Sequence, residues 1–326
     1  MSAPFFCNDP LYPWRKVRQV TWPEFGVAEI PEARLLDEHG WVVGNRDQHL
    51  RDFDYDAGAI SLVVNRITKL RQARRLRGRT LNLSTAHGSY NFYHYVVDGL
   101  SRMDLVEKAG YSWSDFDQII LPPFRSPMTV ALEKAAGIPA EKIVRLRRRD
   151  HVSCEILVQP SYPGWTAQTP WWVVEYLRKL MPPSTGPMTR KIYLPRGGTR
   201  NPARLKAMES RLAELGFEQV DTSNLSELRD KLGTASHVIA AHGAGLTNTF
   251  LCQPAARVLE LMPSDIAHWA HPYYFYTLCS ASQLPYGAIV GRSTRPRRFS
   301  FNATSQSSFD ISAKDFETGL ASFLGA

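Results

Sequence analysis

A glycine turn between two short apolar strands is the feature that most constrains how this chain can fold. Residues 238–241 form an apolar run of the buried-strand type and lead directly into His242-Gly243-Ala244-Gly245. Residues 246–250 are typical of the start of a short helix, Pro254 then breaks the chain, and residues 257–261 predict a second strand. This order of strand, turn, helix and strand is that of an α/β domain.

The same turn predicts a ligand. When a strand feeds a glycine turn that opens a helix, backbone N–H groups and the helix N-terminus point at one place, and such a place binds phosphate. Glu260, near the end of the next strand, can accept hydrogen bonds from ribose hydroxyls. The stretch therefore predicts a nucleoside diphosphate site, although such glycines also occur where a helix packs tightly on a strand.

Composition limits the class of protein. A length of 326 residues is enough for two domains with their own cores. Charged residues make up 21% and hydrophobic residues 44%, which excludes a largely disordered chain. No apolar run approaches the roughly 20 residues of a membrane helix, and the N-terminus lacks a secretory signal pattern. The four cysteines lie far apart without a CxxC pair, so we expect reduced thiols and a cytoplasmic protein.

The chain is basic, with a net charge of +8, which favours anionic partners. Its arginines and lysines gather in three runs, within residues 66–79, 145–149 and 292–298. These runs suit anionic lipid headgroups or a negatively charged glycan, or they are solvated surface. No helix-turn-helix, zinc finger or RNP motif is present, so we expect no specific nucleic acid. Peripheral contact with the inner face of a membrane stays open, as does the oligomeric state.

Strands and helices alternate along the chain in two blocks. The first 50 or so residues are expected to be irregular, and residues 66–77 an exposed basic segment. In the first block the pattern predicts strands at 60–64, 81–83, 118–121, 143–144 and 155–158, and helices at 90–107 and 128–136. After a linker at 160–164 it predicts strands at 191–194, 217–220, 238–241, 257–261 and 288–290, and helices at 170–180, 203–215, 225–232 and 313–324. Two α/β domains with a ligand cleft are expected.

A second strand end carries arginines. Residues 191–194 lead into Pro195-Arg196-Gly197-Gly198-Thr199-Arg200. The guanidinium of arginine suits bidentate contact with phosphate oxygens. Because strand carboxyl ends in one open sheet face the same crevice, Arg196 and His242 can converge on one ligand. The alternative is a solvated loop.

A third group lies in the first block. His94, Asp98 and Arg102 are spaced by four residues and share one face of the predicted helix. A histidine paired with a carboxylate can act as a general base, because the hydrogen bond fixes the imidazole tautomer. The alternative is a structural network that ties the helix to its sheet. His87, His94, His237 and His242 lack the spacing of a metal site.

These segments resemble glycosyltransferase family 61, which includes plant xylosyl- and arabinosyltransferases, animal O-linked GlcNAc transferases and bacterial polysaccharide enzymes. The family motif N-Y-Y-H-W-x-x-D-x-x-x-R is matched by Asn91, Tyr93, His94, Asp98 and Arg102, with Tyr95 in place of the tryptophan. Further family motifs are matched by Tyr193 to Arg196, by Gly216 to Val220, by His242 to Asn248 and by Val258 to Glu260. The order agrees from about Leu81 to Pro263.

The resemblance implies a GT-B architecture within the α/β class: two Rossmann-like domains with a cleft between them. Residues 1–162 would bind the acceptor and residues 163–300 the nucleotide sugar. Residues 301–326 would form a tail whose helix packs back on the N-terminal domain. The implied reaction is inverting transfer of a sugar, foremost from a UDP-sugar, to a hydroxyl of a glycan or lipid-linked oligosaccharide in bacterial surface polysaccharide synthesis. No cofactor and no obligatory metal are implied.

The resemblance also assigns roles to residues. The catalytic pair would be Asp98 and His94, and which of them takes the proton stays open. Donor-binding residues would be Arg196, Arg200, His242, Gly243, Ala244, Gly245, Leu246, Asn248 and Glu260. Acceptor-side residues would be His87, Asn91, Tyr93 and Arg102.

Two other functions compete with this one. A dehydrogenase would carry G-x-G-x-x-G after the first strand of its sheet, whereas Gly243 and Gly245 come late and lack the third glycine. A non-catalytic α/β protein that binds polyanions or nucleotides would need only the arginine runs or the glycine turn, and would leave His94 and Asp98 without a purpose.

Overall fold

The chain divides into two compact units that differ from the predicted domains at the N-terminus. The computed structural model describes residues 2–9, 24–45, 48, 50, 72–164, 167–197, 201–269, 273–294 and 308–325. One unit is Trp22–Thr166, and the other joins Met1–Thr21 to Ala167–Ala326. The expected first domain of 1–162 was therefore wrong for its first residues, which belong with the second half of the chain. The predicted strand at 60–64 lies outside the described residues.

The unit Trp22–Thr166 is built on a mixed sheet with the strand order β3-β2-β7-β4-β5-β6. Its strands are β1 (Val27–Pro31), β2 (Arg34–Leu36), β3 (Trp41–Val43), β4 (Arg74–Asn82), β5 (Gln118–Leu121), β6 (Ile143–Arg145) and β7 (His151–Pro160). Strands β7, β4, β5 and β6 are parallel, whereas β1 and β2 pair antiparallel with β7. The expectation of an irregular start was wrong for these strands, which the sequence does not reveal because β1 to β3 have three to five residues each and show little periodicity.

Residues 66–77 were expected to be an exposed basic segment, and residues 66–71 lie outside the described residues. Arg74, Arg75 and Arg77 are exposed as expected, but they belong to strand β4, in which Leu76 and Thr80 are buried. Pairing with the buried strand β7 decides the conformation here. Two of the arginines meet acidic partners in or just after β1: Arg79 lies 3.0 Å from Glu29, and Arg75 lies 3.8 Å from Glu32. The predicted basic run is therefore partly neutralised.

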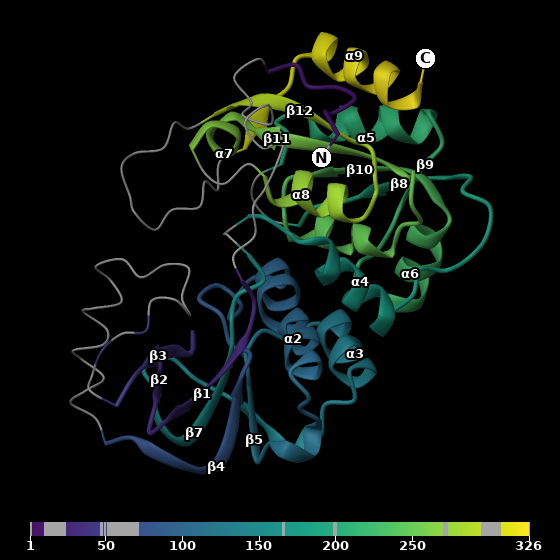
Figure 1. Cartoon of the computed structure of the whole chain (residues 1–326). Coiled ribbons are helices and arrows are strands. Elements are labelled where there is room, and N and C mark those ends of the chain that lie inside the picture. The colour runs from purple at the N-terminus through teal and green to yellow at the C-terminus, as the bar shows by residue number, and fades with distance from the viewer. Residues whose placement is uncertain are drawn as a thin grey trace. The chain divides into compact units, whose positions relative to one another are not determined.

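The helices of this unit are short. They are α2 (Met103–Lys108) and α3 (Pro127–Ala135), with single turns η3 (His94–Gly99), η4 (Leu100–Arg102), η5 (Trp113–Asp115) and η6 (Ala140–Lys142). The predicted helix at 90–107 is thus a π-helical turn, a 3₁₀ turn and an α-helix in succession. α3 is bounded as its sequence indicates, by a Ser126 N-cap and by Gly137 at φ 68°. Both α-helices cover the same face of the sheet (Figure 1).

The other unit holds a sheet of order β13-β12-β11-β10-β8-β9, parallel except for β13. Its strands are β8 (Arg190–Leu194), β9 (Phe217–Gln219), β10 (Ala235–Ala241), β11 (Arg257–Pro263), β12 (Tyr286–Ser293) and β13 (Phe309–Asp310). Chain order reverses between β8 and β10, because the first crossover runs from β8 to β9 and the next returns to β10. Open parallel sheets bind their ligands at such a reversal, beyond the carboxyl ends of the strands.

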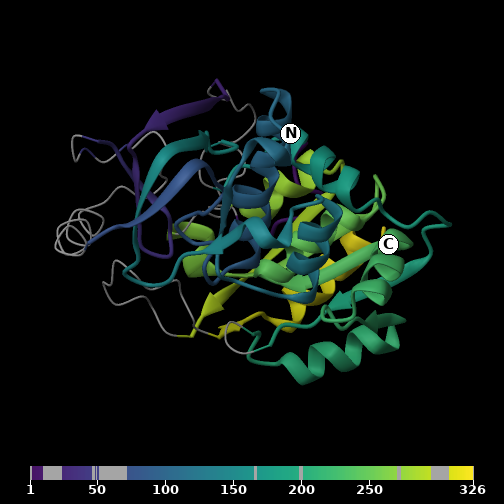
Figure 2. The ribbon, with the colours of Figure 1, turned by 90° about the horizontal axis from the view of Figure 1, so that it is seen from below.

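Helices lie on both faces of this sheet (Figures 1 and 2). They are α4 (Trp171–Leu180), α5 (Leu205–Glu214), α6 (Leu225–Gly233), η7 (Ala244–Leu251), α7 (Ser264–Trp269), α8 (Tyr274–Ala281) and α9 (Ala313–Leu324). α7 and α8 were not predicted. α5 and α9 share one face of the sheet, and α4, α6 and α8 lie on the other (Figure 1). Together with the mixed sheet of the first unit, this arrangement makes the protein a member of the α/β class.

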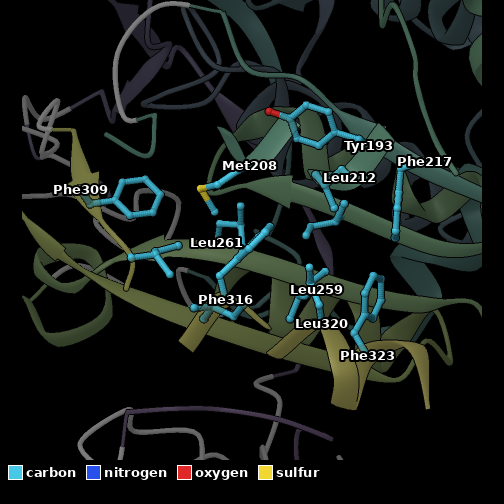
Figure 3. Packing of buried hydrophobic residues seen from close by; sticks show 13 residues of the cluster. Tyr193, Met208, Leu212, Phe217, Leu259, Leu261, Phe309, Phe316, Leu320 and Phe323 are labelled. Carbon is cyan, nitrogen blue, oxygen red and sulfur yellow. The ribbon is translucent and has the colours of Figure 1, made fainter. Parts of the chain in front are cut away.

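The C-terminal helix corrects the expected return to the N-terminal domain. Phe316, Leu320 and Phe323 of α9 pack into the core cluster formed by β8, β11 and α5 (Figure 3). The bounds of α9 match the prediction because Ser312 caps its N-terminus and Gly325 ends it at φ 77°. The apolar face of α9 is therefore buried in the core of its own unit, which contains Ala167–Ala326.

The first residues of the chain cover the edge of the same sheet. Phe5 donates its N–H to Tyr286 O, and Ala288 donates to Phe6 O, so this segment runs beside β12. The side chain of Asn8 both donates to Val290 O and accepts from Val290 N, as a paired strand would. A bare edge strand invites pairing with other chains, and this segment removes that hazard.

No helix among the described residues has the length and hydropathy needed to cross a membrane. All four cysteines are free thiols.

Candidate functional site

The reversal of strand order between β8 and β10 brings together the residues predicted to bind the donor. Arg196 follows β8 and His242 follows β10, and the Arg196 guanidinium donates from Nη1 to His242 O at 2.8 Å. The predicted convergence of these two strand ends is therefore present. A half-buried cation is fixed beside the start of η7, where the first N–H groups of a helix lack partners within the helix.

Gly243 leaves the space that this contact requires. Its backbone is extended, with φ 162°, so that any residue could adopt it. A Cβ on Gly243 would lie 1.5 Å from Nη1 of Arg196, whereas a Cβ on Gly245 would meet nothing within 4 Å. The first glycine of the motif therefore lets the guanidinium lie against the backbone, and the second leaves open space in front of η7.

Glu260 differs from its prediction. The carboxylate is fully buried and accepts two hydrogen bonds, from Tyr286 Oη at 2.6 Å and from His242 Nδ1 at 2.5 Å. Because both oxygens are used inside the protein, Glu260 reaches a ligand only through His242. The carboxylate fixes the imidazole with its proton on Nδ1, and the Phe275 ring packs edge-on against it at 5.4 Å.

The later residues of the His242–Asn248 motif support the turn from the buried side. Leu246 is fully buried, and Asn248 is 3% exposed. Asn248 Nδ2 donates to Gly245 O at 3.0 Å and thereby fixes the turn from within. Ala244 is half-buried and Gly245 exposed, so these two residues form the accessible part of the motif. Arg200 lies outside the described residues.

Arg178 of α4, which the sequence did not single out, holds the far end of η7. Its guanidinium donates to Phe250 O at 2.9 Å, to Cys252 O at 2.7 Å and to Ser282 O at 3.2 Å. These carbonyls lie where η7 and α8 end, and a cation at a helix C-terminus is favourable. Nothing in the linear spacing of Arg178 points to this role.

The second predicted group, His94 and Asp98, lies in the first unit at the carboxyl end of β4. The two side chains are buried, and His94 Nδ1 lies 2.5 Å from Asp98 Oδ2. Both belong to the π-helical turn η3, a rare conformation that is frequent at functional sites. An ionised Asp98 can only accept a hydrogen bond, so the imidazole of His94 carries its proton on Nδ1. The lone pair of the ring is then on Nε2. This is the arrangement of a general base with its orienting carboxylate.

His87 extends this group toward the surface. Its ring lies 5.0 Å from the His94 ring, centroid to centroid. His87 Nδ1 is 2.5 Å from the hydroxyl of Tyr90, and 58% of the surface of Tyr90 is exposed. The sequence prediction included His87 and missed Tyr90. The contact shows an exposed aromatic ring joined to the buried histidine and aspartate.

Arg102 does not share the site that its spacing predicted. It is fully buried and donates to Ser84 O at 2.7 Å and Pro160 O at 3.3 Å, while its guanidinium lies over the ring of Tyr162. Turning from π- to 3₁₀-helix after Gly99 breaks the four-residue repeat, which explains the difference. Arg102 is a structural tie between the β4 loop and the end of β7.

Asn91 and Tyr93 have contacts within the protein, and their acceptor-side role stays a prediction. Asn91 Oδ1 accepts from Tyr93 N at 2.9 Å and so caps the start of this helical stretch. Tyr93 is buried, and its ring packs edge-on against His94 at 5.3 Å.

Tyr95 takes the place of the family tryptophan and anchors η3 from behind. Its hydroxyl donates to Glu133 of α3, and burial raises the pKa of this phenol. Arg145 donates to both oxygens of Glu133 at 2.8 Å. Arg145 was predicted to belong to a basic run open to anions, but it is committed to this buried pair.

One group of possible metal ligands occurs among the described residues, at Asp37, Glu38 and His39. These are consecutive residues in the turn after β2, and the Asp37 oxygens already accept from the N–H groups of Glu38 and Arg149. The expected metal independence stays a prediction.

Comparison with known families now decides the class of the protein. The model of the family described as Glycosyltransferase 61 matches residues 92–259, which is more than half of the chain. The chain belongs to the glycosyltransferase 61 family. The match begins just before η3 and ends within β11, so that it includes His94, Asp98, Arg196 and the glycine turn. No curated protein matches the chain significantly.

Proposed function

We propose that this member of the glycosyltransferase 61 family transfers a sugar, with inversion, from a UDP-sugar to a hydroxyl of a glycan or lipid-linked oligosaccharide. The observation that carries the proposal is the contact of Arg196 with His242 O across the strand-order reversal. It supports a diphosphate site made of one guanidinium and the N-terminus of η7. Bacterial surface polysaccharide synthesis is the proposed context.

In the proposed reaction the acceptor oxygen attacks the anomeric carbon, and the bond from that carbon to the diphosphate breaks. His94 Nε2 takes the acceptor proton, and Asp98 stabilises the imidazolium that forms. Negative charge develops on the leaving diphosphate, where Arg196 and the N–H groups of Ala244 and Gly245 offset it. Because charge is neutralised by these groups, the proposed step needs no metal. Among the two candidates for the base, the Nδ1 contact with Asp98 favours His94.

The experiment separates binding from chemistry. We expect Arg196→Ala to weaken UDP binding in calorimetry by about 10- to 100-fold, since hydrogen bonds to charged groups contribute roughly 1.5–3 kcal/mol. Asp98→Asn should instead leave UDP affinity nearly unchanged and lower turnover by about 10²–10⁴. Turnover is measured by mass spectrometry with a panel of UDP-sugars and acceptors, and the anomeric configuration of the product by NMR.

Three results would contradict the proposal. Unchanged UDP affinity of Arg196→Ala would remove that residue from the site. Wild-type turnover in both Asp98→Asn and His94→Ala would make η3 structural and leave His87 as the next candidate for the base. Failure of the wild-type protein to bind any nucleoside diphosphate would favour the alternative, a non-catalytic polyanion-binding protein.

A further inference from the structure

A buried carboxylate lies at the same edge of the second sheet as the glycine turn. Asp265 is in the first turn of α7, directly after β11, and Ser293 is the last residue of β12. β11 and β12 are paired as far as Pro263 and Gly291, so both residues follow directly after the last pair of the two strands. β10 is the other neighbour of β11, with Ala241 opposite Leu261. Asp265 therefore follows the strand next to the one that carries His242.

One oxygen of the Asp265 carboxylate has a hydrogen-bond donor within the protein. Oδ1 accepts from Ser293 Oγ at 2.8 Å, and the Asp265 N–H points back to the same hydroxyl at 3.2 Å. Ser293 is fixed in turn, because its N–H donates to Ser264 Oγ at 3.1 Å. Ser293 therefore provides the partner of Oδ1 and leaves the other oxygen of the carboxylate.

The second oxygen has no such partner. Asp265 is 8% exposed, and Oδ2 is buried without a hydrogen-bond partner in the described structure. A buried carboxylate oxygen without a donor is unfavourable, and such a group is expected to meet one in the functional state. Rotation about χ2 of an aspartate is soft, so Oδ2 can turn toward a donor that arrives at the strand ends.

We propose that Asp265 binds the ribose hydroxyls of the nucleoside diphosphate. The inference rests on the proposed function, because it takes Arg196 and η7 as the diphosphate site. An ionised carboxylate needs donors, and the ribose diol supplies two, whereas the phosphates supply none and repel it. Glu260, to which the sequence points, is committed to His242 and Tyr286. Asp265 provides the acidic group that this role requires, and it lies just past the end of β11, the strand that contains Glu260.

Calorimetry with three probes tests the assignment: UDP, its 2′,3′-dideoxy analogue and inorganic pyrophosphate. We expect Asp265→Asn to weaken UDP binding about tenfold or more and to leave pyrophosphate binding unchanged. The wild-type protein should bind the dideoxy analogue more weakly than UDP, and Asp265→Asn should lose this discrimination. The matched control is Asp230→Asn, an exposed aspartate of α6 in the same unit, which should bind all three probes like the wild type.

The outcomes are distinguishable from a failure of the proposed function. Equal binding of UDP and the dideoxy analogue by the wild-type protein would overturn the ribose assignment. This test needs no variant, so it applies even if Asp265→Asn folds poorly. Equal loss of UDP and pyrophosphate in Asp265→Asn would also overturn it. If Arg196→Ala binds UDP and pyrophosphate like the wild type, the diphosphate site itself is wrong, and this inference falls with it.

Discussion

At the scale of single residues, the site depends on groups that fix one another before any ligand arrives. Glu260 fixes the imidazole of His242, and Asp98 fixes that of His94. The two histidine–carboxylate pairs are alike in geometry, with an Nδ1 to oxygen distance of 2.5 Å in each. They differ in surroundings, because His242 is backed by Phe275, whereas His94 faces His87. A second histidine beside the ring gives His94 a polar route toward the surface, which suits a base.

The two glycines of the turn provide a sharp test at this scale. Gly243→Ala places a methyl group where Arg196 Nη1 now lies, so the guanidinium must leave its contact with His242 O. We expect UDP affinity to fall about 10-fold or more, because a charge-assisted hydrogen bond and its alignment are lost.

Gly245→Ala is a control for folding alone, since its methyl group meets nothing within 4 Å but lies where the diphosphate is proposed to bind. It should keep the melting temperature of the wild type. Calorimetry with UDP on Gly243→Ala measures the effect on binding. Equal UDP affinity of Gly243→Ala and wild type would show that the position of Arg196 does not matter for binding.

At the scale of elements, η7 is held at both ends. Its start packs on Arg196 through Gly243, and its carboxyl end is tied by Arg178 of α4. The helix that carries the motif is thereby fixed against neighbouring elements at both ends, in addition to its own hydrogen bonds. Such support is what a preorganised diphosphate site requires.

Arg178→Met tests this support. The thioether side chain keeps much of the apolar length but leaves three carbonyls without a charged donor, so we expect a loss of unfolding free energy of about 1.5–3 kcal/mol. UDP affinity should fall as well, because η7 is less well fixed. Lys179→Met, one residue further along α4 and exposed, should change neither quantity. Thermal and denaturant unfolding measure the first effect, and a wild-type stability of Arg178→Met would contradict the tie.

In the unit that contains the glycine turn, the sequence predicted the bounds of several elements closely but missed α7 and α8. Ser312, Gly325 and the apolar spacing of α9 all indicate the same helix. By contrast, β1, β2 and β3 are too short to show a period, and their pairing with β7 is decided by tertiary contacts. The four-residue spacing also predicted Arg102 beside His94. That prediction assumed an α-helix, whereas η3 is a π-helical turn.

The candidate site shows the same division. Convergence of Arg196 and His242 followed from the strand-end rule and is present. The place of Glu260 did not follow, because a strand alternates between two faces, and only the fold decides that this carboxylate is buried against Tyr286. Pairing of Arg145 with Glu133 was equally hidden, since the two residues are distant in the pattern and meet through packing.

At the scale of the whole molecule, charge and burial give two predictions. The net charge of +8 suits an acceptor or surface that carries negative charge. Exposed arginines among the described residues include Arg74, Arg75, Arg77, Arg147 and Arg148. We propose peripheral contact with anionic lipid, and expect sedimentation with phosphatidylserine vesicles at low salt that is lost at high salt. Sedimentation that depends on neither the salt concentration nor the lipid charge would contradict the proposal.

The second prediction concerns acid stability and follows from His237 of β10. Its imidazole packs edge-on against Phe323 of α9 at 5.0 Å, and burial lowers its pKa from the usual 6.5, helped by the positive charges of Arg257 and Lys191. Between this lowered pKa and about 6.5, the unfolded chain binds more protons than the folded one. The unfolding free energy contributed by this residue is therefore fully present above about pH 6.5 and falls as the pH drops through the window below it.

We expect the melting temperature of the wild-type protein to fall between pH 7 and pH 5, and to fall less steeply in His237→Gln, which cannot be protonated. Other groups titrate in the same range, so the difference between the two slopes is the quantity that matters rather than either slope alone. NMR titration of the His237 imidazole in the native protein gives the matching check, an apparent pKa below 6.5. Parallel slopes, or a native pKa at or above that value, would show that the packing of α9 on β10 does not penalise the charged imidazole.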